Sequence, residues 1–216
     1  MKLLPLTLLL LLTGCFADAS HTSLEEYASE LPGAIKNGPG VLRYLSASAG
    51  KAPDVRMAQH YRDVTGKWQY LADPPNHDHF INVESVFKNQ SFRGDCEDFA
   101  ATIMALCAGL NLECHIALGV KNNSGHAWPE LKIHKTIPSR ALLKRLSRLF
   151  GQSASYVYRE NGFWLRLNPK GVLSGYKTHY LINEAGKLQK AGMESILPPW
   201  FDDQKNRRIP QELPLF

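Results

Sequence analysis

Apolar positions recur with helical spacing in two long segments of the chain, 53–66 and 96–109. Side chains three and four residues apart share one face of a helix, so both segments are predicted to be amphipathic helices. Gly109 closes the second segment, which is typical of a helix C-terminus. A shorter helix is expected over 82–90. The apolar positions that carry the pattern are Val55, Met57, Ala58, Tyr61, Phe99, Ala100, Ile103, Met104 and Cys107.

Shorter apolar runs, bounded by turn residues, follow the second helix and predict strands. Turn residues at 122–125 join the first two strands into a hairpin, and Asn161-Gly162 joins the next two. Helices followed by a set of antiparallel strands predict an α+β fold. The predicted strands are 112–120, 126–133, 156–159, 163–167 and 176–182.

A basic amphipathic helix is predicted over 139–150, between the two hairpins. Its leucines line one side, and its arginines and lysine lie largely on the other. One interpretation places this helix on anionic lipid or over a cleft. The other packs the leucines on the domain and leaves the charges in water, and we expect this second arrangement.

The N-terminal segment has the features of a bacterial export signal. Lys2 precedes a leucine-rich run from Leu3 to Leu12, which is too short to span a bilayer. The run ends in Leu12-Thr13-Gly14-Cys15, which resembles the lipobox of bacterial lipoproteins. The resemblance implies cleavage before Cys15 and acylation of that residue, which would anchor the protein to a membrane. Phe16 follows Cys15, where Asp would signal retention at the inner membrane. The resemblance therefore implies that the protein is held at the periplasmic face of the outer membrane.

Composition is that of a soluble globular protein: 44% of the 216 residues are hydrophobic and 21% are charged. The net charge of +5 is not gathered in one long basic run, so nucleic acid is not an expected partner. We expect four parts, which are a signal peptide over 1–14, a lipidated tether with short helices over 15–50, one domain over 51–190 and a Pro-rich tail over 191–216.

A candidate nucleophile lies at the start of the predicted helix 96–109. Asp95 is a good N-cap, which places Cys96 in the first helical turn. Free backbone N–H groups and the helix dipole favour a thiolate there, and the thiolate is the nucleophilic form of cysteine. The acids Asp95, Glu97 and Asp98 oppose this by raising the pKa of the thiol, unless a protonated histidine or a bound metal ion offsets their charge.

His126 is the candidate partner of Cys96, because a cysteine at a helix start facing a strand histidine suits a thiolate–imidazolium pair. Glu130 is too far along the same strand to orient the imidazole, since four strand residues span about 13 Å. Asn168 ends the strand 163–167 before a proline, and its amide can accept from the imidazole N–H. Trp128 shares the strand face of His126 and is expected to wall a cleft.

Three blocks of this sequence resemble the transglutaminase-like superfamily, over roughly residues 68–170. They are Gly-Asp-Cys-Glu-Asp-Phe-Ala at 94–100, Gly-His-Ala-Trp-Pro-Glu at 125–130, and Trp164 through Asn168-Pro169. The resemblance implies a papain-like fold in which Cys96 is the nucleophile, His126 its base and Asn168 the orienting residue. The family usually has Asp where this chain has Asn168, and helix 139–150 is inserted between the second and third blocks.

The resemblance also implies an activity. Cys96 would attack an amide of a protein or peptide substrate and form a thioester, as in the bacterial transglutaminase-like cysteine peptidases. Water as acceptor makes a hydrolase, and an amine makes a cross-linking transglutaminase. The oxyanion would be held by the Cys96 N–H and by an upstream donor, for which Trp68, Gln69 and Asn82 are candidates. A non-catalytic envelope lipoprotein that uses the same fold as a binding module is the rival interpretation.

Metal binding and disulfide formation are open questions. No cofactor is required, but some peptidases of this superfamily bind calcium through acids beside the cysteine, where this chain has Asp95 and Glu97. Without Cys15, three cysteines remain: Cys107 and Cys114 either pair or stay reduced and buried with Cys96. A zinc site that gathers Cys96, Cys107, Cys114 and His115, with His77 or His79 as a further candidate ligand, lacks the usual Cys-x-x-Cys spacing.

Overall fold

The computed structural model describes residues 23–73, 79–122, 124–134, 139–150, 155–159, 162–169, 173 and 176–192. The predicted signal peptide, Cys15 as the expected lipidation residue and the predicted tail from residue 193 lie outside these ranges.

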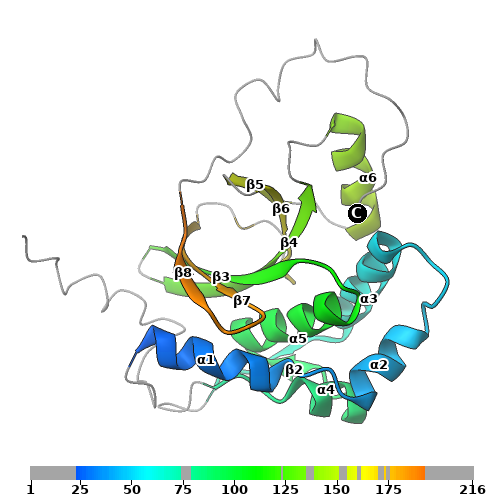
Figure 1. The fold of residues 1–216 in the computed structure, drawn as a ribbon, viewed down its shortest axis with the longest axis horizontal. Helices are drawn as coiled ribbons and strands as arrows, with labels where there is room; N and C mark the ends of the chain where they lie inside the picture. Colours follow the sequence, from blue (N-terminus) through cyan, green and yellow to red (C-terminus); the bar gives the residue numbers. More distant parts are fainter. Residues whose placement is uncertain are drawn as a thin grey trace, which may run out of the picture.

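A six-stranded antiparallel sheet forms one layer of the molecule, in the order β5-β6-β4-β3-β7-β8 (Figure 1). The central pair is a hairpin in which Gly119 lies opposite His126. A separate two-stranded parallel sheet joins β1 (Gln69–Tyr70) to β2 (Arg93–Gly94). The six strands are β3 (Cys114–Lys121), β4 (Ser124–His134), β5 (Ser155–Arg159), β6 (Gly162–Arg166), β7 (Lys177–Asn183) and β8 (Leu188–Lys190).

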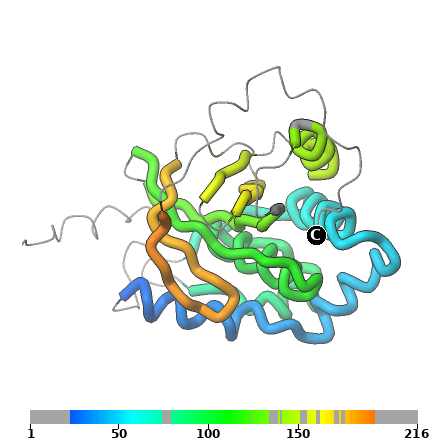
Figure 2. Tube along the Cα trace, turned by 45° about the horizontal axis from the view of Figure 1, so that its top comes forward, coloured from blue at the N-terminus to red at the C-terminus, as the bar shows by residue number. Residues whose placement is uncertain are grey.

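Helices form the second layer, and Figures 1 and 2 both show the first five on one side of the sheet. The central helix α5 packs directly on β3 and β4. Helices α2, α3 and α4 also pack against α5, whereas α6 packs on α3 and α1 contacts β8. The six helices are α1 (Leu24–Ala34), α2 (Pro39–Ser46), α3 (Pro53–Lys67), α4 (Val83–Asn89), α5 (Cys96–Gly109) and α6 (Arg140–Phe150).

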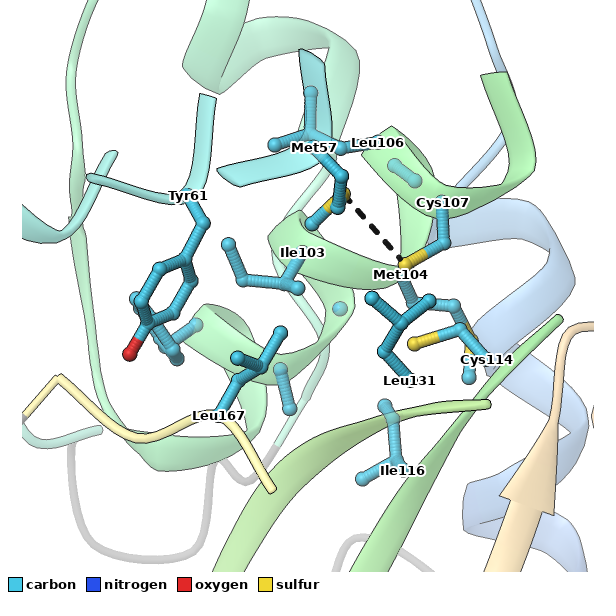
Figure 3. Packing of buried hydrophobic residues seen from close by; sticks show 14 of the residues in the cluster. Met57, Tyr61, Ile103, Met104, Leu106, Cys107, Cys114, Ile116, Leu131 and Leu167 are labelled. Carbon is cyan, nitrogen blue, oxygen red and sulfur yellow. Dashed lines mark hydrogen bonds between the residues drawn. The ribbon is translucent and has the colours of Figure 1, made fainter. Parts of the chain in front are cut away.

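The main hydrophobic core lies between α5 and the sheet. Ile103 and Met104 of α5 are buried against Ile116 and Leu131 of the central strands (Figure 3). Met57 of α3 closes the core from the other side of α5, and the Cys107 thiol lies 3.9 Å from its sulfur. The long α5 can be buried all round because α2, α3 and α4 cover the sides that the sheet does not.

The α+β fold class predicted from the sequence is confirmed, and α3 and α5 have nearly the predicted bounds. The hairpin turn is tighter than expected, since Ser124 and Gly125 already pair with β3. Strands β1, β2 and β8 were not predicted, because two or three residues are too few to show an alternating pattern.

Helices α1 and α2 correct the expected tether over 15–50. Both helices are short, as expected, but Tyr27 and Leu31 of α1 and Val41 and Leu45 of α2 are buried in the main core. The apolar face of each helix therefore packs on the domain, and this part of the segment belongs to the folded body.

Helix α6 packs its leucine side on the domain, as the second interpretation of the sequence expected. Leu143, Leu146 and Phe150 are buried, and the Phe150 ring lies 5.6 Å from the Tyr61 ring of α3. The basic side chains Lys144 and Arg145 are exposed. Across the described ranges, none of the helices combines the length and the hydropathy needed to cross a bilayer.

Candidate active site

The approach to α5 is shaped by Gly94 and by a capping box. Gly94 has a φ of +151°, and a Cβ added there would lie 2.3 Å from an oxygen of Asp98. Asp95 is the N-cap, and the Asp98 carboxylate accepts from the Asp95 N–H at 3.4 Å. The other Asp98 oxygen accepts from the Ile81 N–H at 2.8 Å, which ties the preceding loop to the helix start. These contacts set the position of Cys96, the first residue of the helix.

The Cys96 thiol is buried, with 6% of the residue exposed. Its sulfur donates to a Glu97 carboxylate oxygen at 3.1 Å. The backbone N–H of Ala127, the residue after His126, donates to the same sulfur at 3.4 Å. The sulfur therefore contacts the residue that follows His126, at the point where the first turn of α5 reaches the first half of β4.

The Ala127 N–H can reach the sulfur because β6 ends beside it. Backbone groups of alternate strand residues point to the same neighbour, and the Pro129 carbonyl accepts from Leu167 just beyond β6 at 3.0 Å. Ala127 points the same way, where no β6 residue remains to pair with it. Pro129, which has no N–H to donate, lies just where β4 passes the end of β6.

The His126 side chain lies on the face of β4 that points away from α5. Ala127 belongs to the core under the sheet, whereas Trp128 belongs to the small core on the opposite face. Strand alternation puts His126 with Trp128, and its half-buried ring lies 5.9 Å from the Trp128 ring and 5.2 Å from the Tyr176 ring. The imidazole and the Cys96 thiol therefore approach one open edge of β4 from opposite faces.

Asn168 follows β6 at the same edge. Arg166 pairs with Glu130, and Leu167 bonds to Pro129, so the register continued by one residue sets Asn168 opposite Trp128. The residue is buried, with 8% exposed, and its carbonyl accepts from the Tyr61 hydroxyl at 3.0 Å. The strand pairing thus brings the third predicted residue within two strand positions of His126.

Buried acids surround the thiol. Asp95, Glu97 and Asp98 are all at most 6% exposed. Burial, and then the charge of Asp95, raise the pKa of Asp98 to about 7 against two opposing backbone hydrogen bonds. One ligand atom each from Asp95, Cys96 and Glu97 lies within 4.8 Å of the others, which is compact enough to hold a cation.

The three oxyanion candidates have different surroundings. Trp68 is half-buried, with its ring 5.2 Å from Phe99 in the first turn of α5. Gln69 is exposed and lines a polar cavity of about 360 Å³ beside β2. The Asn82 side chain accepts from the Ser85 N–H at 3.1 Å and caps α4. Of these surroundings, those of Trp68 include the helix that carries Cys96.

A buried ionic cluster on the far face of the sheet was missed by the sequence reasoning. Glu130 does not orient His126 directly, as the strand spacing predicted. Its wholly buried carboxylate accepts from Arg159, Arg166, His115 and the Trp128 indole N–H. Burial raises the pKa of Glu130, but the His115 hydrogen bond and the Arg159 charge outweigh it and hold that pKa well below its ordinary value. The available signal for this cluster was the presence of two charged residues, Arg159 and Arg166, in the otherwise largely apolar strands of the second hairpin.

The remaining cysteines stay buried and reduced. Cys96, Cys107 and Cys114 take part in no disulfide among the described residues. Burial, and then the neighbouring Cys107, raise the pKa of the Cys114 thiol well above its ordinary value. The zinc alternative is wrong for the described residues, because His115 is engaged by Glu130 at 3.0 Å and no metal-sized group there joins His115 to a cysteine.

Trp128, expected to wall a cleft, is wholly buried beneath the site.

Comparison with known families places the chain in one of them. Among curated proteins and among solved structures, none matches it. The family model of the transglutaminase-like superfamily matches residues 45–169, which is more than half of the 216 residues. The matched range runs from the end of α2 to the residue after Asn168 and contains all three blocks of the site. With a helix-start cysteine beside a strand histidine, and with this match, the chain belongs to the transglutaminase-like superfamily.

Proposed function

We propose that the protein is a cysteine hydrolase that cleaves amide bonds of proteins or peptides. The observation that supports this most directly is the position of the Cys96 sulfur, at the N-terminus of α5 and 3.4 Å from the Ala127 N–H, next to His126. A helix N-terminus and a backbone donor both favour negative charge on sulfur. His126 and Asn168 share the same edge of β4.

In the proposed reaction, His126 takes the thiol proton and the sulfur attacks the amide carbonyl carbon. The carbonyl oxygen becomes an oxyanion, for which the Cys96 N–H is one donor, with a second donor from the Trp68 region. The C–N bond then breaks, His126 gives the proton to the leaving amine, and a thioester remains on Cys96. Water, activated by His126, hydrolyses this thioester and restores the thiol.

The location that goes with this function is the cell envelope. The leucine-rich segment and Leu12-Thr13-Gly14-Cys15 support cleavage and lipidation at Cys15, which would hold the domain at the periplasmic face of the outer membrane. Substrates would then be envelope proteins or peptides within reach of the anchor.

Calcium binding at Asp95 and Glu97 accompanies the proposal. Carboxylate oxygens are the ligands that calcium prefers, and Asp95 and Glu97 bring one such oxygen each within 4.8 Å of the other and of the Cys96 sulfur. The donor set fits in its two carboxylates, whereas the Cys96 thiol is too soft to be a calcium ligand. Bound calcium would supply positive charge that favours the thiolate.

Calorimetry and thermal unfolding with millimolar calcium test this site. Binding should raise the midpoint of unfolding, because a ligand at 100 times its Kd adds about 2.7 kcal/mol to stability. Glu97→Gln should abolish the rise, and Glu113→Gln, which changes an exposed acid elsewhere, should retain it. Absence of both heat and a midpoint shift in the wild type would contradict calcium binding.

Alkylation of Cys96 by iodoacetamide across pH tests the catalytic pair. The wild type, as a chain that begins after Cys15, should be alkylated rapidly below pH 7, whereas an ordinary thiol reacts only near its pKa of about 8.5. His126→Ala should remove the reaction at low pH, and Cys96→Ala should remove it at every pH. His179→Ala is the matched control, since His179 is another half-buried histidine of the sheet.

The outcome separates the proposal from its rivals. An ordinary or unreactive Cys96 would favour the non-catalytic binding module, for which Asn168 and the inserted helix 139–150 are the motivating observations. With a reactive Cys96, incubation of casein with a fluorescent primary amine distinguishes acyl transfer from hydrolysis. Hydrolysis releases peptides without incorporating the amine, and amine incorporation would make the protein a transglutaminase.

A further inference from the structure

Aromatic rings surround the His126 imidazole on the far face of the sheet. The Trp128 and Tyr176 rings lie 5.9 and 5.2 Å from it, and they lie 5.8 Å from each other. His126 itself is half-buried. Because the three rings contact one another, the orientation of the imidazole depends on where the indole of Trp128 is held.

The indole of Trp128 is held on several sides. It is wholly buried, and its N–H donates to a Glu130 oxygen at 2.9 Å. The Arg166 guanidinium lies over the ring at 5.3 Å. Gly119, opposite His126, makes room for it, since an added Cβ would lie 2.5 Å from the indole. A single position of the indole satisfies these contacts.

The Glu130 carboxylate that holds the indole is itself immobilised. Arg159 donates to both of its oxygens, one at 3.2 Å, and Arg166 and His115 donate at 3.1 and 3.0 Å. Both arginines also bond to the Thr178 hydroxyl, at 3.0 and 2.9 Å. The donors come from β3, β5 and β6, and Thr178 comes from β7, so the carboxylate is fixed relative to four strands.

Stability is a weak reason for such a cluster, because replacing a buried ion pair with apolar side chains of similar volume is often neutral or stabilising. Its geometric effect is specific, because it fixes an oxygen two residues from Trp128. We infer that Glu130 is a positioning residue, which holds the indole of Trp128 and through it orients the His126 imidazole. This inference rests on the proposed function, in which His126 exchanges protons with Cys96.

Two substitutions break the connection at different points. Trp128→Phe keeps an aromatic ring under His126 but removes the N–H that reaches Glu130. Glu130→Gln keeps the indole and weakens its anchor. Each should lower the rate of Cys96 alkylation at pH 6 by about tenfold or more, since small displacements of reacting groups cost rates of that order. The pH profile should move toward that of an ordinary thiol.

Tyr156→Phe is the matched control. Tyr156 is a buried aromatic residue of β5 that packs in the main core on the opposite face of the sheet, where its hydroxyl donates to the Leu143 carbonyl at 3.2 Å, and phenylalanine keeps the ring but removes this donor. Its alkylation rate should stay within about twofold of the wild type, as expected for a residue outside the connection. Circular dichroism confirms that each variant is folded, and Trp128→Phe is the test if Glu130→Gln is not.

NMR of the His126 ring gives a readout that does not depend on reactivity. The Cε1–H resonance, identified by its loss in His126→Ala, should move in Glu130→Gln, where the indole itself is unchanged. The resonance should also move in Trp128→Phe, where the ring that packs on the imidazole changes. Unchanged alkylation profiles together with an unchanged His126 signal in both variants would overturn the inference. An unreactive wild-type Cys96 would defeat the proposed function alone, and a moved His126 signal would still support positioning by Glu130.

Discussion

At the scale of single residues, the backbone before Cys96 tolerates little change. Gly94 combines a positive φ with a close approach to Asp98, whose carboxylate accepts from the N–H groups of the N-cap Asp95 and of Ile81. Glycine adopts such a φ readily, whereas other residues are strained. Gly94, which permits this turn, lies two residues before Cys96, which carries the thiol.

Gly94→Ala should destabilise the protein by about 2–4 kcal/mol, because it adds both backbone strain and a steric clash at the cap. Urea denaturation measures the change. Gly66→Ala is the control, since a Cβ there meets nothing within 4 Å and alanine favours a helix. A Gly94→Ala protein as stable as the wild type would show that the turn relaxes without cost.

The candidate site was predictable residue by residue only where its signals are local. The Asp95 cap and the position of Cys96 follow from a few adjacent residues. The failure of Glu130 to reach His126 follows from strand spacing alone. The actual partners of Glu130 lie on another hairpin, so no local pattern connects Arg159 with it.

At the scale of elements, the helices that surround α5 contact one another through buried polar groups. Ser48, just after α2, lies 2.6 Å from the His60 imidazole of α3. His60 is buried, and burial, and then the Arg56 charge, lower its pKa below the ordinary 6.5. Packing of α2 against α3 therefore favours the neutral form of the His60 imidazole.

This contact predicts a dependence of stability on pH. Because the folded-state pKa of His60 lies below its unfolded value, its contribution is present above about pH 6.5 and is lost as pH falls toward the lowered value. The stability advantage of the wild type over His60→Gln should thus be smaller at pH 5 than at pH 8. Urea denaturation at both values measures it, and an advantage independent of pH would contradict the prediction.

At the scale of the whole molecule, α1 and α2 complete the core that α5 and the sheet begin. Leu31 and Val41 have no exposed surface, and α2 packs against both α4 and α5. The family match begins at residue 45, so most of these two helices lies before it. The folded unit is larger than the segment that carries the family motifs.

Two truncated chains test this boundary. A chain of residues 23–216 should unfold cooperatively, with a midpoint close to that of the chain that begins after Cys15. A chain of residues 51–216, the boundary expected from the sequence, should be strongly destabilised, since each buried leucine removed costs about 2–5 kcal/mol. Thermal unfolding followed by circular dichroism compares them. Equal midpoints for the two truncated chains would restore the tether interpretation.

The sequence by itself determined the main helices and strands, the α+β class and the location of Cys96 at a helix start, because hydrophobic periodicity and capping act between near neighbours in the chain. Only the tertiary structure decided the strand order, the end of β6 that lets the Ala127 N–H reach sulfur, and the anchoring of Trp128 by Glu130. Those features depend on contacts between residues far apart in sequence, which a pattern of apolar and polar positions does not record.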